Sequence, residues 1–204
     1  MPDVWPDLAR RHGRRAVMSL QVTDAEMDEE TRRQIPILFG IIEHHLTGAE
    51  KTALDFGCGA GRFSHALAQT IKGRVTAVDP CHELIAMAPG AVDVDYHPVE
   101  PGVFFDECVR NGVTYDVVFA AMVLGAPDLP LEATAADLVS VLAPGGLLVV
   151  VDHMPEIIPY DRWWRFRPVD LYQEMFQRNG IEVRKAGALM QLDNEITVLC
   201  GRKL

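Results

Sequence analysis

The feature that most constrains the fold is a regular alternation, from Lys51 onward, of short apolar runs with segments compatible with helices, such as Arg62–Ile71 and Leu131–Leu142. Parallel strands are buried on both faces and read as near-continuous apolar runs, since helices cover the sheet on each side. The pattern therefore predicts an α/β fold with a mostly parallel sheet. The apolar runs are Thr52–Phe56, Arg74–Asp79, Val92–Tyr96, Tyr115–Ala120, Leu147–Asp152, Ile181–Val183 and Ile196–Cys200.

The connection between the last two runs differs from the others. It covers Arg184 to Glu195, is shorter than most of the earlier connections and has no obvious helical pattern. A short connection joins antiparallel strands, whereas parallel strands need a long crossover. The sequence therefore predicts an antiparallel edge on the otherwise parallel sheet.

The first 50 residues follow another pattern. Residues 1–22 are rich in arginine and lack periodicity, and Thr23-Asp24-Ala25-Glu26 then has the form of a helix capping box. Ile35, Leu38, Ile42 and Leu46 follow at helical spacing, with Pro36 expected to kink or divide the helix. We predict a helical cap over residues 1–50 and a main domain over residues 51–204.

The segment Asp55-Phe56-Gly57-Cys58-Gly59-Ala60-Gly61-Arg62 leaves the first predicted strand and enters a helix. Glycine allows a tight turn and lets a ligand approach the backbone, and the free amides of the next helix favour polar ligand groups. Asp55 is suited to bind a cation such as an α-ammonium group. The loop predicts a site for a nucleotide-like ligand.

A dinucleotide such as NAD is the competing ligand for this loop. Its fingerprint places a final Gly or Ala where this chain has Arg62, so the spacing disfavours an NAD-dependent oxidoreductase. Asp79 ends the second strand and could accept both hydroxyls of a ribose. Dinucleotide enzymes share that acid, so Asp79 alone does not separate the two ligands.

Four elements in order carry a resemblance to a known family. They are Asp55–Gly61, the acid Asp79, Tyr115-Asp116-Val117-Val118 and Leu142-Ala143-Pro144-Gly145-Gly146-Leu147. Together they resemble class I methyltransferases that depend on S-adenosyl-L-methionine (SAM), over roughly residues 50–203. The resemblance implies a Rossmann-like seven-stranded sheet with a reversed last strand, SAM as cofactor and S-adenosyl-L-homocysteine (SAH) as product.

The same resemblance implies which residues bind the cofactor. Val99 would pack on the adenine and Glu100 would accept from its amino group, with a solvated loop as the alternative for this segment. Ala121 and Met122 would line the methionine moiety. Many relatives carry a histidine just after the pair that is Val123-Leu124 here, where this chain has Gly125-Ala126-Pro127, so one familiar contact is missing. The implied cofactor-binding residues are Asp55, Gly57, Cys58, Gly59, Gly61, Asp79, Pro80, Val99, Glu100, Ala121 and Met122.

His153, directly after the fifth predicted strand, is the candidate catalytic residue. Methyl transfer depends mainly on alignment, and a base is needed only when the acceptor must lose a proton, as a hydroxyl does. Imidazole titrates near neutral pH and suits that role. The competing interpretation is that His153 only ends the strand beside the cofactor.

Arginines and aromatic residues interleave in Tyr160–Pro168, within an otherwise acidic chain. Arg162, Trp163 and Arg167 could bind an anionic or sugar-bearing acceptor, because guanidinium groups bind carboxylate and phosphate and indole rings stack on planar groups. A packing loop would explain the same composition. Arg10, Arg11, Arg14 and Arg15 could close over the same opening.

Charge and cysteine content narrow the class of partner. The net charge of −10 disfavours nucleic acid, and the most apolar stretch is too short to span a membrane. The four cysteines form no C-x-x-C pair, which indicates reduced thiols in a cytoplasmic protein without a metal site. We expect a monomer or homodimer that methylates a small molecule, on oxygen. A non-catalytic SAM-binding sensor or partner subunit, and an RNA or protein methyltransferase, remain open.

Overall fold

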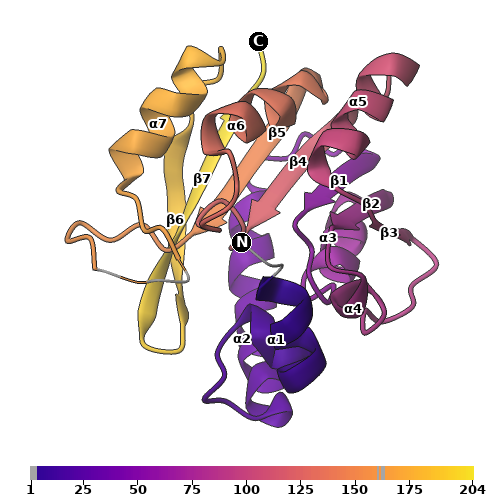
Figure 1. The fold of residues 1–204 in the computed structure, drawn as a ribbon. Coiled ribbons are helices and arrows are strands. Elements are labelled where there is room, and N and C mark those ends of the chain that lie inside the picture. Colours follow the sequence, from indigo (N-terminus) through magenta and orange to yellow (C-terminus); the bar gives the residue numbers. More distant parts are fainter. Residues whose placement is uncertain (1–3, 160, 162–163) are drawn as a thin grey trace.

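The computed structural model describes residues 4–159, 161 and 164–204, which form one seven-stranded sheet with helices on both faces (Figure 1). The strand order is β3-β2-β1-β4-β5-β7-β6. The strands are β1 (Thr52–Phe56), β2 (Arg74–Asp79), β3 (Val94–Pro98), β4 (Tyr115–Ala121), β5 (Leu142–Asp152), β6 (Arg184–Gln191) and β7 (Asn194–Arg202). The helices are α1 (Val4–His12), the 3₁₀ helix η1 (Gly13–Val17), α2 (Asp24–Glu43), α3 (Ser64–Ile71), α4 (His82–Ile85), α5 (Pro101–Asn111), α6 (Leu131–Ser140) and α7 (Val169–Arg178).

The strand order creates a switch point at the centre of the sheet. The chain runs outward from β1 through β2 to β3, then returns to the other side of β1 with β4 and β5. Strands β1 to β5 pair in parallel, and β7 pairs antiparallel with both β5 and β6. Ligands of open α/β sheets bind at the carboxyl ends of the strands beside such a switch point. The predicted α/β class and antiparallel edge are confirmed.

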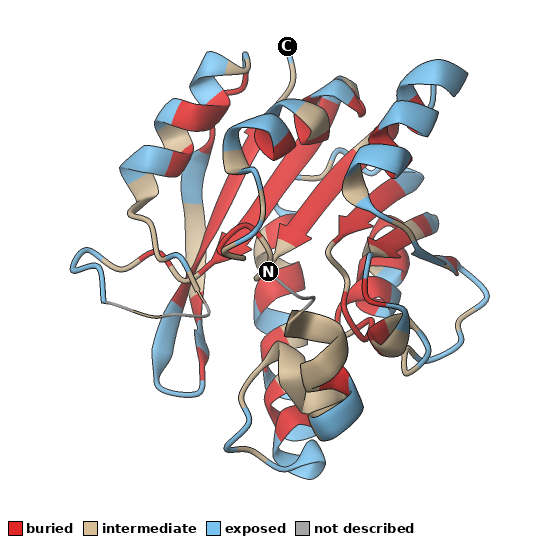
Figure 2. Ribbon diagram, in the orientation of Figure 1, coloured by how far each residue is buried: buried red, intermediate tan, exposed pale blue. Residues whose placement is uncertain are grey.

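Two hydrophobic clusters stabilise the two faces of the sheet. One includes Phe105 of α5, Leu138 of α6 and Tyr172 of α7, and the other includes Leu38 of α2 and Leu67 of α3. Figure 2 shows the central strands as almost wholly buried between these helices. This burial on both faces explains why the strands read as apolar runs in the sequence.

The sixth strand lies later than predicted. Ile181 and Val183 are fully buried, but they lie in the connection after α7 and pack in the core with that helix. The strand itself is Arg184–Gln191, which we had assigned to the connection. Its edge position leaves much of it exposed, so it lacks the apolar run that marks the central strands.

The N-terminal region contains two helical segments before α2. Val4–His12 and Gly13–Val17 are helical, and Val4–His12 is amphipathic, a periodicity that we did not detect in the sequence. Thr23 caps α2 as predicted, with its hydroxyl accepting from the Glu26 amide at 3.2 Å. Helix α2 continues through Pro36, so the expected division is wrong. Its apolar residues pack against the sheet, which outweighs the hydrogen bond lost at proline.

Candidate functional site

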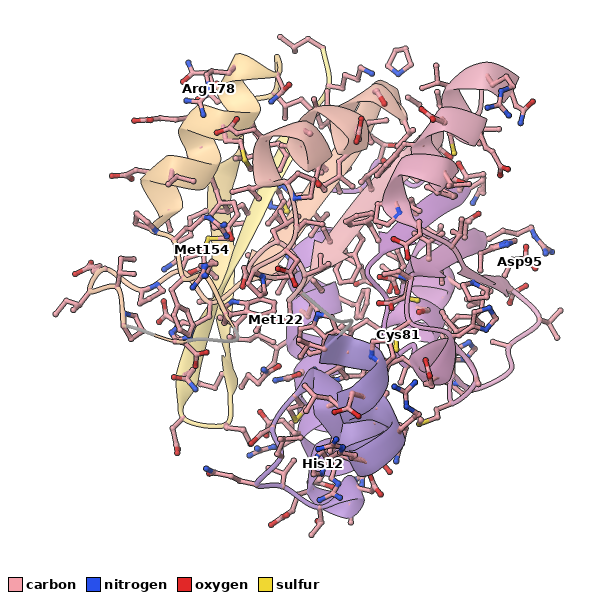
Figure 3. The ribbon with its side chains drawn as sticks, viewed as in Figure 1. His12, Cys81, Asp95, Met122, Met154 and Arg178 are labelled. Carbon is pink, nitrogen blue, oxygen red and sulfur yellow. The ribbon has the colours of Figure 1, made fainter. Side chains whose placement is uncertain are left out.

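A cavity of about 850 Å³ lies at the carboxyl ends of β1, β2, β4 and β5, beside the switch point. The N-terminal segments Val4–Leu8 and Ala16–Leu20 contribute to one wall of the cavity. In Figure 3, Met122 and Cys81 are labelled at the strand ends, and His12 of α1 lies below them. The volume lies within the range of small-molecule and cofactor sites.

The glycine loop between β1 and α3 requires glycine at each of its three positions. Gly57, Gly59 and Gly61 have φ values of 70°, 55° and 73°, which side chains rarely adopt. A Cβ atom on Gly57 would lie 2.2 Å from Val123, and one on Gly61 would lie 2.5 Å from the Tyr96 hydroxyl. Gly57 and Gly59 line the cavity, whereas Gly61 packs against Tyr96 behind the loop.

The carboxylate of Asp79 is fixed at the rim of this loop. It accepts hydrogen bonds from the backbone amides of Gly59, at 2.9 Å, and Cys81, at 2.8 Å. Burial raises the pKa of Asp79, although both of these hydrogen bonds act to lower it. A pair of hydroxyl donors would find a positioned acceptor here, as the sequence predicted for a ribose.

Asp55, the penultimate residue of β1, is buried directly before the glycine loop. Its carboxylate accepts from the Ser64 hydroxyl at 2.6 Å, a contact that the sequence analysis did not identify. Burial raises the pKa of Asp55 to about 7, and the charge of Asp79 raises it further against the effect of Ser64. A cationic ligand group would relieve both penalties, because opposite charge favours the ionised carboxylate.

The other implied cofactor residues surround the same cavity. Cys58, Pro80, Val99, Glu100, Ala121 and Met122 all line it. Met122 has a φ of 52°, an unusual backbone conformation for a residue other than glycine. Strained residues of this kind cluster at ligand sites, which agrees with the position of Met122 at the end of β4.

His153 follows β5 and lines the cavity, with its ring edge-on to Phe166 at 4.8 Å between centroids. Burial lowers its pKa, so the imidazole is neutral at physiological pH and able to accept a proton. The neighbouring Asp152 is fully buried and accepts from the Tyr172 hydroxyl at 2.9 Å and from Trp164 Nε1 at 3.3 Å. Asp152 therefore fixes the segment after β5.

The structure explains why this chain has Gly125 where many relatives have a histidine. A Cβ atom there would lie 2.0 Å from the indole of Trp164, so glycine makes room for that ring at the cavity wall. Arg165 also donates its amide to the Gly125 carbonyl at 2.7 Å. A histidine at this position would exclude Trp164 in its present place. In the sequence this change reads only as the loss of a contact, because the ring that takes the place of the histidine comes from a distant segment.

The predicted acceptor residues have different positions. Arg167 donates to the carbonyl oxygens of Leu124, at 2.9 Å, and Arg165, at 3.0 Å, and is not among the residues that line the cavity. Arg162 and Trp163 lie outside the described residues. Among the described residues of this segment, the aromatic side chains that line the cavity are Trp164 and Phe166, both part of the arginine-aromatic stretch singled out in the sequence.

The N-terminal arginines do not contribute to the cavity lining. Arg10 pairs with Glu83, Arg14 pairs with Asp28 and Arg11 pairs with Asp7. The cap instead contributes mainly apolar side chains, among them Trp5, Leu8, Val17, Met18 and Leu20. Val17 lies over the glycine loop, 3.1 Å from the position of a Cβ atom on Gly59.

The described residues also bear on metal binding and on membrane-spanning helices. In this part of the chain, no group of three or more His, Cys, Asp and Glu side chains could hold a metal ion. None of the helices that the structure describes is long and apolar enough to cross a membrane.

Comparisons with known proteins agree with this geometry. A family model described as a methyltransferase domain matches residues 24–187. A ubiquinone biosynthesis O-methyltransferase of Burkholderia cenocepacia is 31% identical over 119 residues, which cover 54% of this chain and 48% of the relative. The chain therefore spans about half the length of that relative.

Solved structures share the fold at low sequence identity. Magnesium protoporphyrin IX methyltransferase from Synechocystis PCC 6803, with bound SAM, has a TM-score of 0.70 and 18% identity, covering 99% of this chain and 94% of that one. An N-methyltransferase from Bradyrhizobium japonicum, in complex with SAH, has a TM-score of 0.64 and 19% identity, covering 84% and 86%. These likenesses extend over most of the sheet and its helices.

Proposed function

Because the chain belongs to the methyltransferase-domain family and has the class I SAM-dependent fold, we propose that it transfers a methyl group from SAM to a small-molecule acceptor, at an oxygen atom. The observation that carries this proposal is one cavity that combines a glycine loop with two carboxylates, the buried Asp55 and the half-buried Asp79. In this proposal, residues 1–50 act as a cap over a SAM-binding domain of residues 51–204.

The residues present fit SAM. The cavity is large enough, the loop exposes backbone without side chains, and Asp79 offers a fixed acceptor for the ribose hydroxyls. Asp55 offers a negative charge to the α-ammonium group. When bound, SAM supplies a methyl group activated by its sulfonium charge. The contribution of the protein is then to position the acceptor and to exclude water.

His153 is the proposed base for a hydroxyl acceptor. Its neutral imidazole lines the cavity, where it could accept the hydroxyl proton as the new carbon–oxygen bond forms. Trp164 and Phe166 provide flat apolar surfaces beside it for a ring-bearing acceptor. The name of the Burkholderia relative, an O-methyltransferase, supports oxygen as the methylated atom.

An anionic or sugar-bearing acceptor remains a prediction from the sequence. It depends on Arg162 and Trp163, which lie outside the described residues, and on Arg167, whose contacts are with backbone carbonyls. A cytoplasmic location and a monomeric or homodimeric state also remain predictions from the sequence.

The proposed activity is tested by incubating the protein with SAM labelled in its methyl group and an extracted pool of metabolites. Label should appear in a small molecule while SAH accumulates. Asp79→Ala should weaken SAM binding by about 1–3 kcal/mol, because the ribose hydroxyls lose a charged acceptor. Binding of SAM without turnover would instead identify a non-catalytic SAM-binding protein, and failure to bind SAM would refute the proposal.

A further inference from the structure

Arg62, the residue that follows the glycine loop, has a role that the loop pattern does not explain. Within the part of the chain that the structure describes, Arg62 is the one lysine or arginine that lines the cavity. Five acidic residues line the same cavity: Asp55, Asp79, Glu100, Asp128 and Asp161. Among the described residues that line the cavity, Arg62 is therefore the one basic side chain that an anionic group of a ligand could contact.

The guanidinium of Arg62 is held by neutral groups. It donates to the Gln34 side chain at 2.6 Å, to the Thr31 hydroxyl at 3.2 Å and to the Gln191 side chain at 3.3 Å. The Phe63 ring lies 4.8 Å from the guanidinium carbon. A guanidinium group has five N–H donors, so these contacts leave donor capacity for a ligand.

The acceptor on Gln34 is itself fixed in orientation. The Gln34 amide nitrogen donates to the Glu30 carboxylate at 3.2 Å and to the Met190 carbonyl at 3.1 Å. Its oxygen is thereby directed at Arg62, since only the amide nitrogen can donate to those two acceptors. Helix α2 and strand β6 together hold the guanidinium beside the glycine loop.

The charge of Arg62 has no direct ionic partner among the described residues. Glu30 is the nearby carboxylate, and it is committed to Arg33, to Gln34 and to the Leu192 amide. Burial lowers the pKa of Arg62 to about 10, which still leaves the group charged at neutral pH. A partly buried charge held by neutral groups is stabilised when an anion binds it.

We propose that Arg62 binds a carboxylate of the ligand in this cavity, and that this carboxylate is the one on the methionine moiety of SAM. The inference rests on the proposed function. Asp55 precedes the glycine loop and Arg62 follows it, so the two residues would bind the ammonium and the carboxylate of one amino-acid group. An acceptor carboxylate has the same chemistry and is the other possible source.

The test compares SAH with an analogue in which hydrogen replaces the carboxylate, by calorimetry on the unmodified protein. The unmodified protein should bind SAH about 10- to 100-fold more tightly than the analogue, as expected for a charge-assisted contact. Arg62→Gln should lose most of that preference while binding the analogue almost normally. Arg62→Lys should retain part of it.

Arg32→Gln is the matched control, because Arg32 is an exposed arginine on α2 that pairs with Glu29. It removes the same charge and should leave the preference for SAH intact. Equal binding of SAH and the analogue by the unmodified protein would overturn the proposal, whether or not the variants fold. Equal weakening of both ligands by Arg62→Gln would also overturn it, since Arg62 would then only support the loop.

The two sources of a carboxylate are separated by kinetics with a carboxylated acceptor. An unchanged preference for SAH in Arg62→Gln, together with a raised KM for that acceptor, would assign Arg62 to the acceptor and overturn its assignment to SAM. If the unmodified protein binds neither SAH nor the analogue, the proposed function fails together with this inference.

Discussion

Asp55 and Asp79 place two carboxylates in one cavity, and burial raises the pKa of each. Buried carboxylates are costly when ionised, and neighbouring negative charges add to that cost: Asp79 raises the pKa of Asp55, and Glu100 raises the pKa of Asp79. The protein without ligand accordingly holds a proton on Asp55 up to about pH 7. A cation binds best after that proton has left, so the charge arrangement links ligand affinity to pH.

We expect the affinity for SAM to rise between pH 5.5 and about 7 and then to level off. The folded-state pKa of Asp55 lies above its ordinary value of 3.8, so below about pH 7 the ammonium group must displace a proton. Affinity changes by up to about tenfold per pH unit in that window. Titration calorimetry at several pH values measures it, and Asp55→Asn should flatten the profile. A flat profile for the unmodified protein would contradict the role of Asp55.

The same shift has the opposite effect on the stability of the protein without ligand. The folded protein holds a proton at Asp55 that the unfolded chain releases near pH 3.8. Its contribution to the free energy of unfolding therefore falls as pH rises from about 4 to 7. Asp55→Asn should remove this decline, as denaturant unfolding at several pH values would measure.

His153→Ala should reduce turnover by about 10²- to 10⁴-fold and leave SAM affinity nearly unchanged, if His153 is the base. Because burial lowers the imidazole pKa, the rate of the unmodified protein should rise with pH through a midpoint below 6.5. Steady-state kinetics across pH 5 to 8 measure both effects. Retention of most activity by the variant, or a rate independent of pH, would leave His153 a positioning role.

At the scale of elements, His153, Trp164 and Phe166 lie between β5 and α7 and line one side of the cavity. Asp152 positions its neighbours there, since its buried carboxylate accepts from Trp164 Nε1, the Tyr172 hydroxyl and the His153 amide. Gly125, after β4, provides the space for Trp164. The position of Trp164 therefore depends on two neighbouring strand ends: Asp152 of β5 accepts its hydrogen bond, and Gly125 after β4 leaves room for its ring.

Gly125→Ala should raise the acceptor KM by about tenfold and change SAM affinity little. The new methyl group would overlap the indole of Trp164, which must then move at a cost typical of overpacking. Gly90→Ala is the control, because a Cβ atom on Gly90 meets nothing within 4 Å. An unchanged acceptor KM in Gly125→Ala would show that Trp164 does not shape the acceptor site.

At the scale of the whole molecule, the N-terminal part of the cap, Val4–Leu20, covers the site. Val17 lies over Gly59, α1 packs against α4, and the surface pairs Arg10–Glu83 and Arg14–Asp28 connect this part to α4 and α2. Exposed ion pairs contribute little, so apolar contacts supply most of the attachment. No residue of Val4–Leu20 belongs to the two clusters that pack on the sheet, so we expect this part to open without unfolding the sheet.

Bound SAH should slow amide hydrogen exchange in Val4–Leu20, because the ligand adds contacts beneath the cap. Helix α7 does not line the cavity and should exchange at an unchanged rate, which makes it the internal control. Hydrogen exchange followed by mass spectrometry measures both segments. Equal exchange in Val4–Leu20 with and without SAH would mean that the cap does not respond to the ligand.

Short-range patterns by themselves determined the fold class, the glycine loop and the ends of β1 and β2. Burial on both faces forces apolar runs, and a tight turn at positive φ requires glycine, so each leaves a local signal. Asp55 and Asp79 follow from the same signals, because they lie at the ends of the first two strands. The resemblance to class I SAM-dependent methyltransferases, and not a local signal, implied the other cofactor residues.

Tertiary structure alone decided the features that depend on contacts between distant segments. Strand β6 lies at an edge with little apolar pattern, and its position depends on pairing with β7. Trp164 lines the cavity because Gly125 leaves room for it, and the cap presents apolar side chains because its arginines pair elsewhere. In the sequence, Arg62 is only a departure from the dinucleotide fingerprint. In the fold, its guanidinium donates to Gln34 and Gln191, which are distant in sequence. Partners so far apart in sequence leave no local signal, because the chain brings them together only when the core packs.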